Sequence, residues 1–291
     1  MKICMPSYLV TGAGGQLGQC FQYIASEFPQ YRLFFPTHPE VDINKFGTLS
    51  NYFEKSPFTG IINCAGHTEV DKAETEDKEA YQINAWGVQN LIDFAEVKNL
   101  KLIHFSTDFV FDGTKKTPYI EGDTTNPLNI YGKSKLAGEL VLAKSNCQSV
   151  CIRLSWLFSP FGKNFVKTII NVSKSTTELV VVNDQFGKPT YGIDLARAVL
   201  TSLRNPNFYK YKTYHFAQGP DTSWYDFAQS IIKLTGINCV LQPINSSAYS
   251  KAAMRPMNSS LSTQRIEKTL SLNIRHWHLA LEDCLKKIQD S

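Results

Sequence analysis

The chain has 291 residues, of which 43% are apolar, 30 are Lys or Arg and 26 are Asp or Glu. This composition is typical of a globular protein and excludes a disordered, collagen-like or low-complexity chain. The formal net charge of +4 is spread thinly, and no run of basic residues is longer than a pair such as Lys115-Lys116, so we expect neither nucleic acid nor an anionic membrane as a partner.

Short apolar runs alternate with amphipathic stretches over the first 155 residues. The expected strands are Tyr8–Thr11, Arg32–Phe35, Gly60–Cys64, Leu102–Phe105 and Val150–Leu154. The clearest helix runs from about 78 to 98, where apolar residues recur at helical spacing. Strands of this kind alternating with helices are typical of a parallel sheet covered on both faces. We therefore expect an α/β, doubly wound fold with a first domain over residues 1–155.

After residue 155 this alternation loosens. A strand at Leu179–Val182 and helices at Ile193–Arg204 and Trp224–Thr235 are expected, separated by Pro- and Ser-rich connections. We expect parts of 178–205 to complete the first domain. Residues 156–291 should form mainly a smaller region against the carboxyl edge of the sheet, which is where open parallel sheets bind ligands.

The first chemical signal is a glycine-rich segment, YLVTGAGGQLG over residues 8–18. Gly12, Gly15 and Gly18 allow a tight turn, close approach of a pyrophosphate to backbone N–H groups, and close packing of helix on strand. A glycine triplet alone can be an ordinary loop. Here it follows the first strand and opens a helix, which is the context that predicts dinucleotide binding.

The second signal is Tyr131-Gly-Lys-Ser-Lys135. Four-residue spacing places the phenol and the ammonium on one helix face. A neighbouring cation should lower the pKa of the phenol and make it a proton donor near neutral pH. An isolated pair of this kind is more often a solvated surface pair, but Ser106-Thr107-Asp108 ends the preceding apolar strand. Hydroxyl, phenol and ammonium are therefore expected to converge.

These motifs together resemble the extended short-chain dehydrogenase/reductases, a Rossmann-type superfamily, and longer segments resemble the dTDP-4-dehydrorhamnose reductase family. The segments are NCAGHTEVDKAE (63–74), STDFVFDG (106–113), NPLNIYGKSKLAGE (126–139), RLSW (153–156), NDQFGKPT (183–190) and RPMNSSL (255–261). With the fingerprint they run from residue 9 to about 265 in the family's order. The resemblance implies an NAD(P)-binding Rossmann domain followed by a substrate-binding region.

The resemblance also implies catalytic roles. Tyr131 matches the proton donor. Lys135 matches the lysine that binds the nicotinamide ribose and lowers the pKa of the phenol. Thr107 matches the residue that hydrogen-bonds the reacting oxygen.

Three further positions match substrate contacts of the family. Asp108 lies beside Thr107 against the sugar, and Trp156 matches an aromatic contact to the deoxysugar. Arg255 resembles a partner for the diphosphate, because a guanidinium fork fits phosphate oxygens. A core tryptophan and a surface arginine are the alternatives for the last two residues.

The implied cofactor is NADPH or NADH. Its binding positions are Gly12, Gly15, Gln16, Leu17 and Gly18 at the pyrophosphate, Asp42 and Ile43 at the adenine, Ala65, Gly66, His67 and Thr68 as a wall, and Tyr131 and Lys135 at the reacting end. About twenty residues past the fingerprint, an acid that would bind the adenosine ribose is replaced by Thr37-His38. Thr37 and His38 are expected cofactor contacts as well, because Thr37 can donate a hydrogen bond to the 2′-phosphate and His38 can carry partial positive charge. With no carboxylate expected there to repel the 2′-phosphate, NADPH should be accepted at least as well as NADH.

Some members of the family bridge a dimer through magnesium, using carboxylates that correspond here to Cys20 and Ile193. Neither residue suits magnesium, which prefers carboxylate oxygens. Asp194 would be the second counterpart if the alignment shifts by one residue. We therefore expect a monomer with no bound metal and no magnesium-bridged dimer.

The expected reaction is reduction of the C4 ketone of dTDP-4-dehydrorhamnose to dTDP-L-rhamnose. The alternatives are a reductase of another 4-keto nucleotide sugar, or a noncatalytic regulatory subunit like that of methionine adenosyltransferase. Seven cysteines at scattered spacings indicate a reducing compartment. No apolar run approaches the ~18 residues of a membrane span, and the N-terminus does not resemble a signal peptide. The cytoplasm is the expected location.

Overall fold

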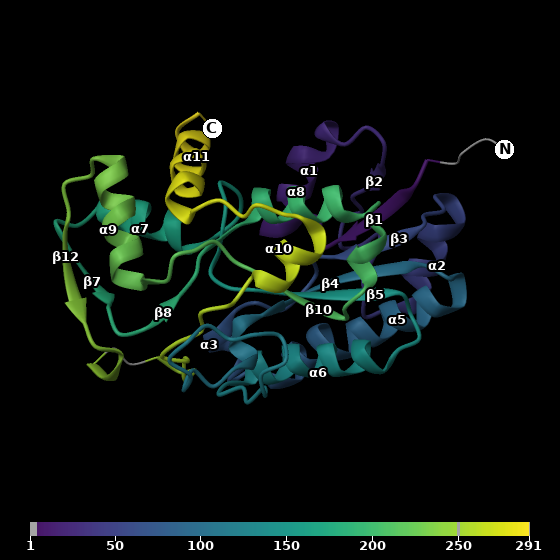
Figure 1. Ribbon diagram of the computed structural model, residues 1–291, viewed down its shortest axis with the longest axis horizontal. Coiled ribbons are helices and arrows are strands. Elements are labelled where there is room, and N and C mark those ends of the chain that lie inside the picture. Colours follow the sequence, from purple (N-terminus) through teal and green to yellow (C-terminus); the bar gives the residue numbers. More distant parts are fainter. Residues whose placement is uncertain (1–4, 249–250, 291) are drawn as a thin grey trace.

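A parallel sheet of six strands forms the centre of the molecule (Figure 1). The computed structural model describes residues 5–248 and 251–290. The strands are β1 (Ser7–Thr11), β2 (Arg32–Phe34), β3 (Gly60–Asn63), β4 (Lys101–Thr107), β5 (Ser149–Leu154) and β10 (Thr213–Phe216), in the order β2-β1-β3-β4-β5-β10. The chain order reverses between β1 and β3, so their carboxyl ends border the crevice where such sheets bind ligands.

The five strands expected in the first 155 residues are confirmed to within three residues at each end. The sixth strand, β10, was not expected, and it lies beyond the 178–205 range that was to complete the first domain. Its residues, TYHF, include no aliphatic side chain, so they do not form an apolar run like those of the other central strands. It pairs with β5, where Tyr214 lies opposite Ile152, and both side chains are fully buried.

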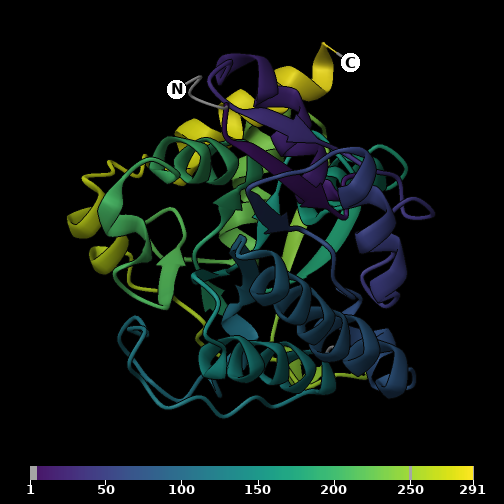
Figure 2. The same cartoon turned by 90° about the vertical axis from the view of Figure 1, so that its right-hand side faces the viewer.

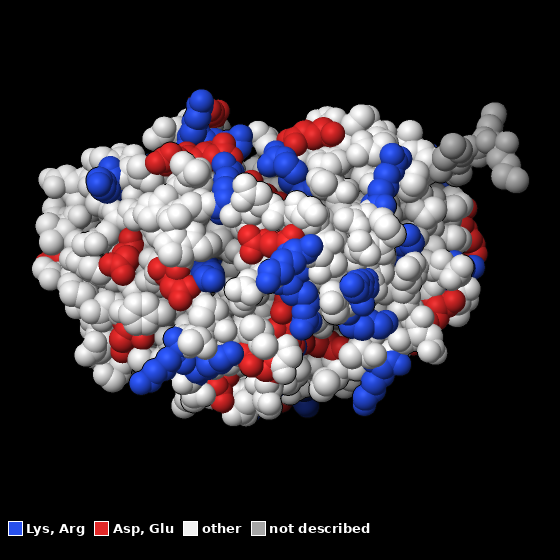
Figure 3. Space-filling model, in the orientation of Figure 1, with Lys and Arg blue, Asp and Glu red and all other residues white. Residues whose placement is uncertain are grey.

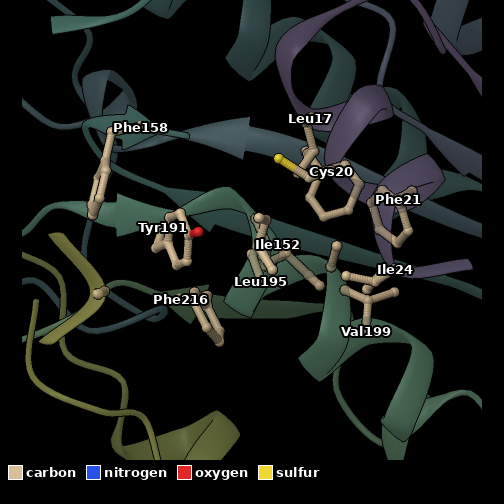
Figure 4. Packing of buried hydrophobic residues seen from close by; sticks show 14 of the residues in the cluster. Leu17, Cys20, Phe21, Ile24, Ile152, Phe158, Tyr191, Leu195, Val199 and Phe216 are labelled. Carbon is tan, nitrogen blue, oxygen red and sulfur yellow. The ribbon is translucent and has the colours of Figure 1, made fainter. Parts of the chain in front are cut away.

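Helices cover both faces of the sheet (Figure 2). The helices on one face are α2 (Phe46–Lys55), α5 (Gly87–Lys98) and α6 (Ile130–Lys144), and those on the other are α1 (Gln16–Ile24), α8 (Gly192–Ser202) and α10 (Gln264–Leu270). The apolar residues of α1 recur every three or four positions, which gives the helix one buried face. That face packs against Leu195 and Val199 of α8 (Figure 4), so α8 from the 178–205 range does support the sheet layer.

The helix expected from about 78 to 98 is confirmed, with an irregular turn inside it. It consists of α4 (Asp77–Tyr81), a π-helical turn η2 (Gln82–Trp86) and α5. Such π-turns are rare and are often found at functional sites. This one carries Asn84, which is fully buried.

The second region lies at the carboxyl end of the sheet and contains three small two-stranded sheets. These pair β6 (Leu157–Phe158) with β9 (Thr190–Tyr191), β7 (Glu178–Val182) with β12 (Val240–Ile244), and β8 (Phe186–Gly187) with β11 (Thr222–Ser223). Its helices are α7 (Phe165–Ser173), α9 (Trp224–Thr235) and α11 (Trp277–Gln289). The expected strand at Leu179–Val182 and the helix at Trp224–Thr235 are thus confirmed.

Short elements complete the chain. They are α3 (Val70–Ala73) and the 3-10 turns η1 (Ala25–Glu27), η3 (Asp108–Val110), η4 (Pro206–Tyr209) and η5 (Ser246–Ala248). Basic and acidic side chains alternate over the face shown in Figure 3. Among the described residues, no helix combines the length and the apolar character that crossing a membrane requires.

A buried ion pair joins α6 to β5. The Arg153 guanidinium donates to both carboxylate oxygens of Glu139, at 2.7–3.1 Å, and both side chains are 7% exposed. Arg153 also lies over the Phe111 ring, 5.1 Å from its centroid. Two charges at this depth are tolerated only as partners, because removal of either leaves the other charged and without compensation in the interior.

We predict that Glu139→Ala lowers the free energy of unfolding by about 3–5 kcal/mol, because it leaves the Arg153 charge buried and unpaired. Urea denaturation measures this loss. The double variant Glu139→Leu/Arg153→Met, which removes both charges, should recover most of it. A double variant as unstable as the single one would show that the ion pair is not the cause.

Candidate active site

Thr107, Tyr131 and Lys135 converge where β4 meets α6. Thr107 is the last residue of β4, and α6 begins one residue before Tyr131. The Asn129 side chain caps this helix by accepting from the Gly132 amide at 2.7 Å. A Cβ on Gly132 would lie 2.2 Å from the carbonyl oxygen of Phe109 in η3, so only glycine allows the first turn of α6 to approach η3, which directly follows β4, this closely.

Burial is the largest influence on the pKa values of Tyr131 and Lys135. It raises the pKa of Tyr131 to about 12, and a hydrogen bond with Thr107 opposes the rise only in part. It lowers the pKa of Lys135 to about 8. The Lys135 ammonium donates to the Phe105 carbonyl oxygen at 2.6 Å. The expectation that Lys135 lowers the phenol's pKa below its usual value is therefore wrong for the protein by itself, because burial outweighs every favourable contact of the phenol.

The glycine-rich turn after β1 has the shape that a dinucleotide requires. Gly12 has φ +62°, and a Cβ there would lie 2.5 Å from the Ala65 amide nitrogen, so the turn touches the end of β3. The Gly15 amide donates to the Gly12 carbonyl within the turn. The amides of Gln16 and Leu17 stand in the first turn of α1, where N–H groups have no partner within the helix. The Leu17 side chain itself lies in the core.

The segment after β2 contains an acid that the sequence analysis did not single out. Glu40 accepts from both the backbone amide and the hydroxyl of Thr37, at 2.7 and 2.8 Å, and these bonds lower its pKa. His38 lies 3.8 Å from Asp42, and its side chain is 82% exposed. Ile43 is buried. The donors of Thr37 that were expected to favour NADPH thus already have a carboxylate partner.

Asn84, which the sequence analysis missed, holds the expected cofactor wall in place. Its side chain accepts from the His67 amide and donates to the His67 carbonyl, at 2.9 and 3.0 Å. It also donates to the Ser134 hydroxyl on α6 at 2.9 Å. One amide therefore fixes the segment Ala65–Thr68 and α6 relative to each other. Nothing in the helical pattern of the sequence distinguished Asn84 from an ordinary core position.

A cavity of about 890 Å³ lies between β7, α7 and the segment 251–257. Arg255 lines it and Phe109, two residues after Thr107, reaches it. The Arg255 guanidinium is not a free surface group: it forms two hydrogen bonds to the Asp71 carboxylate, at 2.8 and 3.1 Å. That pair ties the segment to α3.

Trp156 follows β5 by two residues and is only partly buried, which differs from an ordinary core tryptophan. Its ring stacks on Trp224, with the centroids 3.6 Å apart and the planes 10° apart, and Trp224 lines the cavity. Trp156 has φ +48°, a left-handed conformation that is unfavourable for a bulky side chain and is often found at functional sites. Trp224 was also absent from the expected site.

Comparisons with known proteins agree on one family. The family model described as RmlD substrate binding domain matches residues 6–290. A dTDP-4-dehydrorhamnose reductase of Aggregatibacter actinomycetemcomitans is 36% identical over 96% of this chain and 98% of its own length. A solved dTDP-4-dehydrorhamnose reductase of Clostridium acetobutylicum is 37% identical, with a TM-score of 0.91 over 97% of this chain and 99% of its own. A third, from Bacillus anthracis in complex with NADP, is 32% identical with the same TM-score and coverage.

We predict that Asn84→Ala weakens dinucleotide binding by about tenfold, because His67 and Ser134 lose buried hydrogen-bond partners worth about 1–3 kcal/mol. Fluorescence titration with NADPH measures the affinity. Gln89→Ala, on an exposed hydrogen bond of the same helical stretch, is the control and should bind normally. Unchanged affinity in Asn84→Ala would contradict the role of this side chain.

Proposed function

The chain belongs to the family described as RmlD substrate binding domain, and from this premise we propose that it is a dTDP-4-dehydrorhamnose reductase. It reduces the C4 ketone of dTDP-4-dehydrorhamnose to dTDP-L-rhamnose with NADPH or NADH. The observation that carries the proposal is the convergence of Thr107, Tyr131 and Lys135 next to the segment Ala65–Gly66, which the glycine-rich turn also touches. The bound dinucleotide supplies the hydride.

Thr107, Tyr131 and Lys135 have different roles in the reduction. Negative charge develops on the ketone oxygen during reduction, and the Thr107 and Tyr131 hydroxyls stabilise it. Tyr131 then gives its proton to that oxygen as general acid. Lys135 orients the nicotinamide ribose and adds a positive charge near the phenol. The amides of Gln16 and Leu17 and the wall Ala65–Thr68 hold the dinucleotide, with Asp42 and Ile43 at its adenine end.

The nucleotide sugar occupies the cavity that Arg255 and Trp224 line. Asp108 and Trp156 contact the sugar. Arg255 faces the diphosphate with the guanidinium edge that Asp71 leaves open, since Asp71 bonds only its two terminal nitrogens. In this arrangement residues 1–155, α8 and β10 form the dinucleotide-binding domain, and most of 156–291 binds the substrate.

We further propose that the enzyme is a monomer without a magnesium bridge. Cys20 and Ile193 are fully buried. The Asp194 carboxylate accepts from Arg275 at 2.6 and 3.0 Å and from Gln218 at 2.8 Å, so its oxygens are already occupied. The cytoplasmic location stays a prediction, which agrees with the free state of the six cysteines that the structure describes.

We predict that Tyr131→Phe lowers turnover by about 10²–10⁴-fold, the usual contribution of a general acid, while binding of NADPH is retained. The assay follows NADPH oxidation with dTDP-4-dehydrorhamnose, and NMR establishes the configuration of the product at C4. Tyr23→Phe, which removes a half-exposed hydroxyl on α1, is the control. Near-normal turnover in Tyr131→Phe would refute the catalytic assignment, and a wild-type protein without turnover would favour the noncatalytic alternative.

We predict that Glu40→Gln raises kcat/KM for NADPH severalfold and changes that for NADH little. The substitution removes a negative charge beside the Thr37 donors, where a 2′-phosphate would be repelled. Steady-state kinetics with both cofactors measure the effect. Glu54→Gln, which neutralises an exposed acid on α2, is the control. An equal change for both cofactors would show that Glu40 does not face the 2′-phosphate.

We predict that chelation leaves the oligomeric state unchanged. Light scattering with and without EDTA measures the molecular mass in solution, and magnesium is then added back. A dimer that dissociates on chelation and re-forms with magnesium would refute the proposed state.

A further inference from the structure

Asp108 carries a buried carboxyl group whose second oxygen has no partner. It begins η3 directly after Thr107 and is 3% exposed. Its Oδ1 accepts from the Thr107 hydroxyl at 3.0 Å. The Ser259 hydroxyl also approaches this carboxyl, but Oδ2 has no hydrogen bond within the described part of the chain. A buried carboxylate in this position is unfavourable, so its protonation state matters for its neighbours.

The Thr107 hydroxyl has only one proton to give. In the structure that proton points to Asp108, while Thr107 Oγ1 accepts from the Phe109 amide at 3.2 Å. Tyr131 lies close enough to the same hydroxyl for Thr107 to lower the pKa of the phenol. As long as Asp108 takes the proton, Thr107 cannot donate to the ketone oxygen of a substrate.

We propose that Asp108 is a positioning residue that acts through Thr107: its neutral carboxyl releases the Thr107 proton toward the ketone oxygen, and its ionised carboxylate withdraws that proton. The inference rests on the proposed reductase function. No bond to Asp108 forms or breaks during turnover, and the proton that reaches the product still comes from Tyr131. A neutral carboxylic acid kept in an apolar site is an established means of supporting an oxyanion.

The surroundings of Asp108 favour the neutral form. Thr107 on β4, Tyr131 on α6 and Ser259 face it, and none of the groups that most affect it is a cation. Burial raises its pKa to about 7. The charge of an ionised Asp108 also raises the pKa of Tyr131, and it would repel a developing alkoxide. Ionisation of Asp108 therefore opposes the reaction in three ways.

The first test is the pH dependence of kcat/KM for ketone reduction. In the wild-type enzyme, kcat/KM should fall about tenfold for each pH unit above about pH 7. In Asp108→Asn, which is neutral at every pH, that decline should be absent. A decline above about pH 8 should remain in both enzymes, because the Lys135 ammonium titrates there. A decline from about pH 7 that persists in Asp108→Asn would overturn the proposal.

The variant Thr107→Ala distinguishes two effects of Asp108 on activity: the orientation of the Thr107 hydroxyl proton, and the negative charge of the Asp108 carboxylate. Its activity at low pH should be about 10²–10³-fold lower, as for loss of one oxyanion donor, and the decline from about pH 7 should become shallower, because only the effects of the carboxylate charge on Tyr131 and on the alkoxide remain. A full decline in Thr107→Ala would show that Asp108 acts by its charge alone, which would refute the role assigned to the hydroxyl.

A second test needs no substrate, so it distinguishes failure of this inference from failure of the proposed function. The ordinary pKa of an Asp is 3.8, and the folded protein raises it to about 7. The stability due to this proton is complete below about pH 4 and is lost as the pH rises to about 7. The urea midpoint of Asp108→Asn should therefore rise relative to the wild type between these pH values and then stay level. A constant difference between the two proteins would show that Asp108 is ionised throughout and would overturn the inference.

Discussion

Burial of the Lys135 ammonium is the constraint on which the arrangement of the site depends. A lysine 5% exposed to solvent must be compensated by nearby oxygens, and the Phe105 carbonyl at the carboxyl end of β4 provides one at 2.6 Å. Glu139, one helical turn further along α6, favours the charged form of Lys135. Arg153 in turn holds Glu139 in place. Helix α6, which carries Tyr131 and Lys135, is therefore fixed to the sheet by charges in the core as well as by apolar packing.

The position of α6 also determines the geometry of the ligand crevice. Asn84 in the π-turn bonds Ser134 on α6 and both backbone groups of His67. Because one amide bonds both elements, the Asn84 side chain links the segment Ala65–Thr68, the proposed cofactor wall, to the helix that carries Tyr131. Asn84 lies in the irregular π-helical turn between α4 and α5, and such turns are often found at functional sites.

Burial of the site makes the charged forms of its titratable side chains less favourable. Tyr131, Lys135 and Asp108 all have a pKa displaced toward the neutral form, and burial is the largest cause in each case. Displacements of this kind in one cluster are typical of groups that exchange protons. The same burial explains why a simple pairing of Tyr131 with Lys135 fails to describe the phenol: the ammonium points to a carbonyl, and Thr107 is the partner of the phenol.

The sequence by itself determined the α/β fold and five of the six central strands, and it predicted the residues proposed to carry the chemistry. Those features depend on local signals: apolar periodicity, a glycine turn after a strand, and a Tyr and Lys four residues apart. Only the tertiary structure decided that Thr213–Phe216 joins the sheet, that Glu40 occupies the donors of Thr37, and that Asn84 and Trp224 border the site. Each of these features depends on how closely separate segments of the chain approach one another and on which polar groups then form hydrogen bonds. The distances between segments and the burial of their side chains are determined by tertiary packing, and local sequence patterns do not predict them.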